Sequence, residues 1–156
     1  MPYTYYMIIY LGADHRGFAL KEQLKEVLKN EGYELMDVGA VALTPDDDYA
    51  DYAQLAAAKV SEAPSSVRAI LLCSSGVGMD IVANKFTGVR SVLAISPDHA
   101  YAARHDDDVS VLSIAVDFVP ADTVMKIVTV FLTTPFGGDE RYERRLEKIA
   151  VIEGNR

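Results

Sequence analysis

Cys73 is the only cysteine of the chain, and it stands where an apolar run meets a glycine-containing turn. Ile70-Leu71-Leu72 precedes it, Ser74-Ser75-Gly76-Val77-Gly78 follows it, and a helical pattern begins after that. The dipole and free N–H groups at a helix N-terminus favour a thiolate, so a thiol placed here suits a nucleophile or a base. A lone cysteine is also often a small buried hydrophobe, and the sulfur by itself leaves both interpretations open.

The loop after Cys73 has a composition typical of an anion-binding turn. Glycines let a backbone approach a ligand closely, and the N–H groups of Gly76, Val77 and Gly78 would point at it. Ile81 stands where a dinucleotide-binding fingerprint has its third glycine, and the Gly-Lys-Ser/Thr of a P-loop is absent. The alternative is that the glycines only make a tight strand-to-helix turn.

Two histidine-containing clusters could also carry chemistry. Asp14-His15-Arg16-Gly17 directly follows the first apolar run, where it could hold a polar substrate or, alternatively, let Asp14 cap a helix. Arg104-His105-Asp106-Asp107-Asp108 combines a histidine with carboxylates, but His99 and His105 lack the spacing of metal ligands. We therefore expect no metal site and favour His105 as an acid–base residue.

A pair of arginines lies near the end of the sequence. Arg141 and Arg145 are four positions apart, so they share a helical face and could grip one phosphate group. The alternative is that they form surface ion pairs with Glu140 and Glu143.

Five strand-like runs alternate with six helix-like segments along the chain. The expected strands cover residues 7–13, 33–38, 68–73, 89–95 and 109–116. The expected helices cover residues 18–30, 52–61, 80–86, 97–105, 122–132 and 141–152. This alternation predicts one α/β domain whose parallel sheet is covered by helices on both faces. Ligands bind such sheets at the carboxyl ends of the strands, which would gather Asp14, His15 and the Cys73 loop at one edge.

Bulk composition limits the possible partners and locations. The 156 residues predict a single domain, 1–156, in which residues 1–6 are a short extension without the pattern of a secretory signal. A formal net charge of −8 argues against nucleic-acid binding through a basic face, and no apolar run is long enough to span a membrane. One cysteine rules out an internal disulfide and fits a reducing compartment, so we expect a cytoplasmic protein.

Taken together and in this order, these segments resemble the type B ribose-5-phosphate isomerases, a family that also contains galactose-6-phosphate and allose-6-phosphate isomerases. The matching stretches are Gly12-Ala-Asp-His-Arg-Gly-Phe-Ala-Leu-Lys21, Asp48-Tyr-Ala-Asp-Tyr-Ala53, Cys73-Ser-Ser-Gly-Val-Gly78, Ala83-Asn-Lys-Phe-Thr-Gly-Val-Arg90, Arg104-His-Asp-Asp107, and Gly137-Gly138 followed by Arg141 and Arg145. No single stretch is specific, but their combination is.

The resemblance implies a three-layer αβα sandwich built on a Rossmann-like, five-stranded parallel sheet. It implies an aldose–ketose isomerase, acting first of all on ribose 5-phosphate, that moves a proton between C1 and C2 through a cis-enediolate without a metal or an organic cofactor. Cys73 matches the general base of one branch of the family, and Met79 occupies the position of the glutamate base of the other. The helix N-terminus is expected to lower the pKa of this thiol from its ordinary value of ~8.5.

The resemblance also assigns roles to the other site residues. Ser75 assists proton movement between O1 and O2, and the N–H groups of residues 76–78 stabilise the enediolate. His105 opens the sugar ring with help from Asp14. The residues that contact the rest of the sugar phosphate are His15, Tyr49, Asp106, Arg141 and Arg145.

In this family the active site is built across a dimer. The resemblance therefore implies that His105 and the two arginines reach the Cys73 loop of a second subunit, and that the C-terminal helix packs on that subunit. A homodimer, or a pair of such dimers, is the expected assembly.

Four positions depart from the family pattern. Ser74 stands where glycine is usual, Asp106 where asparagine is usual, Asp117 where a phosphate-binding arginine is usual, and Tyr142 where histidine is common. An aspartate facing the phosphate would repel it, so either the phosphate sits differently or the substrate is another sugar phosphate. The alternatives are isomerisation of allose 6-phosphate or galactose 6-phosphate, or a homologue that binds a sugar phosphate without converting it.

Overall fold

Residues 7–154 are described by a computed structural model, and the expected extension at residues 1–6 lies outside them. The strands are β1 (Ile8–Ala13), β2 (Glu34–Asp37), β3 (Val67–Cys73), β4 (Ser91–Leu93) and β5 (Val111–Ala115). The helices are α1 (Phe18–Asn30), α2 (Tyr49–Glu62), α3 (Val77–Ala83), α4 (Pro97–Asp107), α5 (Ala121–Thr133) and α6 (Glu140–Gly154). Within this part of the chain, no helix combines the length and the apolar character needed to cross a membrane.

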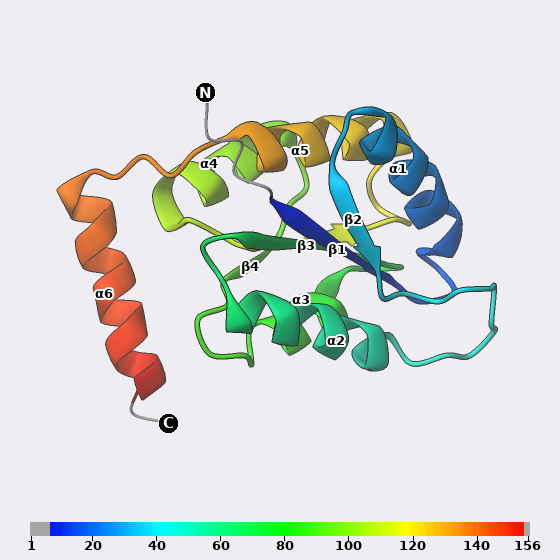
Figure 1. Ribbon diagram of the computed structural model, residues 1–156, viewed down its shortest axis with the longest axis horizontal. Helices are drawn as coiled ribbons and strands as arrows, with labels where there is room; N and C mark the ends of the chain where they lie inside the picture. The colour runs from blue at the N-terminus through cyan, green and yellow to red at the C-terminus, as the bar shows by residue number, and fades with distance from the viewer. Residues whose placement is uncertain (1–6, 155–156) are drawn as a thin grey trace.

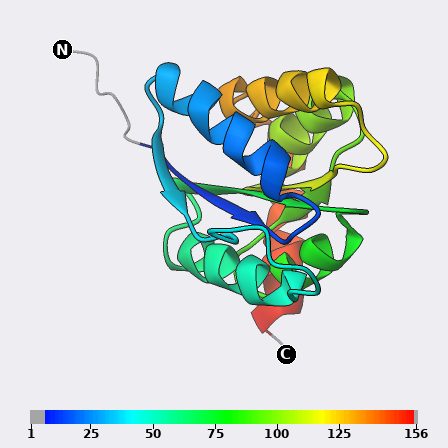
Figure 2. The same ribbon diagram turned by 90° about the vertical axis from the view of Figure 1, so that its right-hand side faces the viewer.

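The five strands are parallel and form one sheet in the order β2-β1-β3-β5-β4. Helices α1, α4 and α5 cover one face of the sheet, and α2 and α3 cover the other (Figures 1 and 2). This three-layer arrangement confirms the αβα fold expected from the sequence. The strand β2 pairs with one side of β1, and β3 pairs with the other side, so the strand order reverses at β1. A ligand cleft is therefore expected between the carboxyl ends of β1 and β3.

The central strands are buried on both faces. Every residue of β3 and β5 is buried, as expected for parallel strands between two helical layers. Alternate residues of β3 serve two separate cores: Ile70 and Leu72 pack with residues of α1, α4 and α5, whereas Leu71 and Cys73 pack with residues of α2 and α3. Cys73 therefore ends β3 on the face covered by α2 and α3, at the edge formed by the carboxyl ends of the strands (the carboxyl edge).

Two helices begin earlier than the sequence indicated. The α3 helix covers Val77–Ala83 rather than residues 80–86, because Gly76 has a left-handed φ of 72° and turns the chain directly from β3 into the helix. The α2 helix begins at Tyr49 rather than at residue 52. Both shifts place predicted site residues in the first turn of a helix, where backbone N–H groups lack intrahelical acceptors.

Gly17 lets the start of α1 rest on the end of β3. A Cβ at this position would clash with the carbonyl oxygen of Leu72 and lie 2.6 Å from its carbonyl carbon. Both of those atoms belong to the backbone of a central strand, so they cannot move aside without shifting the whole strand. The glycine therefore fixes the turn at residues 14–17 beside Cys73.

We predict that Gly17→Ala lowers the free energy of unfolding by about 2 kcal/mol or more, because the added methyl group overpacks a backbone contact. Gly154→Ala is the matched control, since it lies in α6 and nothing is within 4 Å of a Cβ added there. Denaturant unfolding of both variants measures the difference. Equal stabilities would contradict the close contact between the start of α1 and β3.

Candidate active site

Cys73 is held in a turn that requires glycine. Its Sγ accepts a hydrogen bond from the N–H of Gly76 at 3.2 Å, and only 4% of the residue is exposed. A Cβ on Gly76 would clash with the Leu93 side chain and lie 3.0 Å from the backbone carbon of Ile114, besides being strained at this φ. The turn is therefore enclosed by β4 and β5, and it holds backbone N–H groups beside the thiol.

Burial decides the acidity of this thiol. It raises the pKa of Cys73 above the ordinary value, and the nearby Asp14 carboxylate adds to the rise. The backbone N–H groups of Gly76, Met79 and Ser75 lower the pKa, but they do not offset burial. The expectation that the helix N-terminus lowers the pKa of this thiol is therefore wrong for the subunit, because desolvation of the thiolate outweighs those N–H groups.

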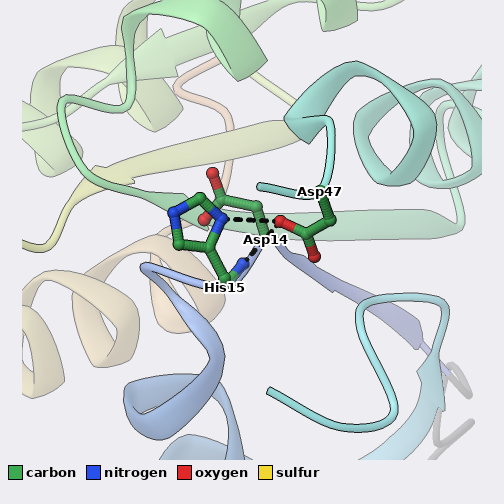
Figure 3. Close-up of side chains that lie close together, drawn as sticks. All are labelled: Asp14, His15 and Asp47. Carbon is green, nitrogen blue, oxygen red and sulfur yellow. Dashed lines mark hydrogen bonds and ion pairs between the residues drawn. The ribbon is translucent and has the colours of Figure 1, made fainter. Parts of the chain in front are cut away.

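Asp14 and His15 follow β1 and are held by different contacts (Figure 3). Asp14 Oδ1 accepts hydrogen bonds from the N–H groups of Arg16 at 3.0 Å and Gly17 at 3.1 Å, so it holds the turn that leads into α1, although it does not cap the helix itself. The backbone N–H and the ring Nδ1 of His15 lie 2.9 and 2.7 Å from Asp47 Oδ1. An ionised carboxylate only accepts hydrogen bonds, so Nδ1 donates and Nε2 stays available to a ligand.

Asp47 is a site residue that the sequence did not single out, although it lies in a polar run just before α2. Burial raises its pKa, but hydrogen bonds from His15 and from the Tyr52 hydroxyl (3.0 Å) outweigh burial and lower it overall. Asp14, His15 and Asp47 each offer one atom that could bind a metal ion, and these three atoms lie within 4.8 Å of one another, a spacing that a cation could use. Because Oδ1 of each carboxylate already accepts N–H bonds, the contacts favour a hydrogen-bonded network that orients the His15 ring.

Tyr49 covers the loop that follows Cys73. A Cβ on Gly78 would overlap the Tyr49 ring and lie 2.8 Å from its hydroxyl oxygen, so the glycine lets the ring rest on the backbone. In the same loop, Ser75 Oγ accepts the Val77 N–H at 3.4 Å. The structure thus brings all the predicted site residues up to Gly78 to the carboxyl edge.

The remaining predicted residues lie at the other end of the sheet. The α4 helix starts at the carboxyl edge, and its 11 residues run back by roughly 16 Å at ~1.5 Å per residue. His105 therefore lies toward the amino ends of the strands, and α6 stands at the end of the molecule opposite the loop of residues 38–48 (Figure 1). Within one subunit, the structure does not bring His105, Arg141 or Arg145 to Cys73.

His105 is packed among aromatic rings. Its ring stacks on Tyr101 at a centroid separation of 5.2 Å and meets Tyr142 edge-on at 5.6 Å. Its Nδ1 lies 2.8 Å from Asp106 Oδ1, and this hydrogen bond lowers the pKa of Asp106. Gly137 packs on the same ring, where a Cβ would lie 2.7 Å from Nε2. His105 and Asp106 thus have the geometry of an oriented acid–base pair.

Tyr142 organises the two arginines. Arg141 Nη2 donates to the Tyr142 hydroxyl at 2.7 Å, and the guanidinium carbons of Arg141 and Arg145 lie 4.6 and 5.8 Å from the ring centroid. These cation–π contacts hold both cations around one buried ring. The sequence pattern does not point to this role of Tyr142. Tyr101, in contrast, could have been recognised as a neighbour of His105, because it lies four residues before it on a helix.

Comparisons with known proteins agree with this fold. A sequence profile of the family described as Ribose/Galactose Isomerase matches residues 9–149. The probable ribose-5-phosphate isomerase B of Mycoplasma genitalium is 38% identical over 145 residues, covering 93% of this chain and 95% of the relative. The ribose-5-phosphate isomerase B of Mycobacterium tuberculosis is 37% identical over 147 residues, covering 94% and 90%. The crystal structure of the M. genitalium enzyme with bound ribulose-5-phosphate superposes with a TM-score of 0.93 at 36% identity, covering 96% of this chain and 98% of that chain.

We predict that the Cys73 thiol titrates above the ~8.5 of an unperturbed cysteine, because burial raises its pKa. The ultraviolet absorbance of the thiolate, followed against pH, measures this property. Cys73→Ala provides the blank, since the chain has no other cysteine. Thiolate absorbance that is already complete at neutral pH would show that the N–H groups, and not burial, dominate.

Proposed function

The chain belongs to the ribose/galactose isomerase family, and we propose that it interconverts ribose 5-phosphate and ribulose 5-phosphate. The observation that carries the proposal is the close structural agreement with a relative whose structure holds ribulose-5-phosphate. The position of Cys73 and His15 at the carboxyl edge, where such sheets bind ligands, supports it. We infer a cytoplasmic location, because a reducing compartment keeps a single thiol free.

The proposed reaction moves one proton between neighbouring carbon atoms. In the open-chain aldose, the Cys73 thiolate takes the proton from C2, and the electron pair left behind forms the C1–C2 double bond of a cis-enediolate. The Ser75 hydroxyl relays a proton from O2 to O1, and the thiol returns its proton to C1, which leaves the ketose carbonyl at C2. Met79 is fully buried and has no proton-accepting group, so it offers no rival base.

Backbone N–H groups stabilise the enediolate in this proposal. Its negative charge develops on O1 and O2, close to the first turn of α3. The N–H groups of residues 77 and 78 belong to that turn and have no intrahelical acceptor. Gly76 fixes the turn against β5, so these donors are in place before the charge appears.

The raised pKa of Cys73 has two opposite effects on a base that acts on carbon. A thiolate with a higher pKa is a stronger base, although it forms a smaller fraction of the thiol at neutral pH. Burial therefore increases the driving force of proton transfer while it reduces the amount of active base.

We propose that the complete site forms across a homodimer. Cys73 and His105 lie at opposite ends of one subunit's sheet, so His105 would act on the sugar held by a second subunit. The α6 helix supports this assembly, because it stands apart from the sheet and Ile149, Val151 and Ile152 are 40%, 65% and 60% exposed (Figure 1). An apolar helix flank of this kind, beside a hollow of about 400 Å³, is suited to packing on a second copy.

In that assembly, residues from both ends of the subunit act on the sugar ring and the phosphate. His105 opens the furanose ring with help from Asp14, and Asp106 keeps the His105 ring oriented through Nδ1. Tyr49 lines the sugar site. The phosphate contacts are His15, Arg141 and Arg145, and the two arginines carry the positive charge that a phosphate requires.

We predict that the purified protein forms ketose from ribose 5-phosphate faster than from allose 6-phosphate or galactose 6-phosphate. Cys73→Ala should lower proton exchange at C2 by at least about 100-fold, because it removes the base, while substrate affinity stays within a few-fold. The exposed Ser66→Ala is the matched control and should leave both unchanged. A Cys73→Ala protein that keeps most of its activity would show that the base is misassigned, and no turnover of any of the three sugars would overturn the proposal.

A mixing experiment tests the shared site. We predict that Cys73→Ala and His105→Ala proteins are each inactive, but that refolding them together restores about a quarter of the wild-type activity. Half of the randomly formed dimers are mixed, and each mixed dimer has one site with both an intact Cys73 and an intact His105. Steady-state assays of the refolded mixture measure the recovery. A mixture as inactive as its components would mean that the two residues do not combine across subunits.

A further inference from the structure

One carboxylate oxygen joins three segments that are far apart in the sequence. Asp117 lies just after β5, and its Oδ2 accepts hydrogen bonds from Arg16 Nη2 and from Ser74 Oγ, both at 2.6 Å. Ser74 and Asp117 are two of the positions at which the chain departs from the family pattern. These two departures are not independent, because their side chains are bonded to each other.

The cluster of Arg16, Ser74 and Asp117 lies at the carboxyl edge, beside the Cys73 loop. The N–H of Asp117 also donates to the Ser74 carbonyl at 3.1 Å, and Ser74 follows Cys73 directly. Arg16 is the residue after His15, whose Nε2 is available to a ligand at the same edge. The Arg16 guanidinium is therefore close to the proposed sugar-phosphate cleft.

Arg16 brings positive charge to an edge that is rich in carboxylates. Asp14, Asp47 and Asp117 all lie there, and a phosphate dianion meets repulsion unless a cation balances them. Hydrogen bonds from Ser74 and Arg16 lower the pKa of Asp117, and Asp117 raises that of Arg16, so both groups stay ionised. The Arg16 side chain is 53% exposed, and within residues 7–154 only one of its five N–H groups has a hydrogen-bond partner.

We propose that Arg16, positioned by Asp117, binds the phosphate group of the substrate; this inference rests on the proposed isomerase function. Asp117 engages one N–H of the guanidinium and leaves the other donors of the fork for a phosphate. Ser74 in turn fixes Asp117 to the Cys73 loop. The chain thereby keeps a guanidinium at this edge although position 117 itself carries a carboxylate.

Substitution of Arg16 tests the contact directly. Arg16→Gln should raise KM for ribose 5-phosphate by about 10- to 100-fold and change kcat by less than about threefold, because the lost charged hydrogen bond is made in ground and transition states alike. Titration calorimetry with inorganic phosphate should show a loss of affinity of similar size. Arg16→Lys keeps the charge without the fork and should recover part of the binding.

Further variants test the positioning role of Asp117. Asp117→Asn should weaken phosphate binding less than Arg16→Gln does, and it should add nothing in the double variant, because it acts through Arg16. The exchanged pair, Arg16→Asp with Asp117→Arg, should restore the phosphate affinity that Arg16→Asp alone removes, since a guanidinium again lies beside a carboxylate at this edge.

Lys59→Gln is the matched control, because it removes a cation from an exposed ion pair with Glu62 on α2, away from the carboxyl edge. It should change neither KM nor phosphate affinity. Unchanged KM and phosphate affinity in Arg16→Gln, or tighter phosphate binding in Asp117→Asn, would overturn the proposal. If the wild-type protein converts none of the sugars, the isomerase function fails, and the phosphate titrations still decide the role of Arg16.

Discussion

The direct contact of two backbone turns with the carboxyl ends of β3 and β5 is the constraint on which the rest of the site depends. Gly17 sets the first turn against the Leu72 carbonyl group, and Gly76 sets the second against β5. Since no side chain separates these backbones, the Asp14 turn, Cys73 and the first turn of α3 meet at one edge of the sheet. Such contacts cannot relax without moving whole elements, which keeps the groups around Cys73 in fixed positions.

The same close contacts determine what the thiol can do. Exclusion of water disfavours the thiolate of Cys73 more than the neighbouring N–H groups favour it, so its pKa is raised. Cysteines that form covalent intermediates usually have lowered pKa values, because the thiolate must be abundant at neutral pH. A base that removes a proton from carbon must also be ionised, although a higher pKa makes its thiolate more basic. Burial therefore makes Cys73 a stronger base but lowers the fraction of it that is thiolate at neutral pH.

Local sequence pattern predicted the order of the elements but not the contacts between distant residues. All eleven strands and helices occur in the predicted order, because apolar periodicity and glycine turns are local signals. The predicted start of α3 was wrong, since periodicity does not register the left-handed turn at Gly76. The bond between Arg16 and Asp117 spans 101 positions and depends on a strand order that alternation alone does not specify.

The arrangement of positive charge shows what the proposed shared site requires. A chain with a formal net charge of −8 must concentrate cations where it binds an anion, and the arginines in question are already held, Arg16 by Asp117 and Arg141 by Tyr142. An arginine side chain carries about 2 kcal/mol of rotamer entropy, so side chains fixed beforehand lose less of it when a phosphate binds. Because Arg16 and Arg141 lie at opposite ends of one subunit, they can act on the same phosphate only if a second subunit supplies one of them.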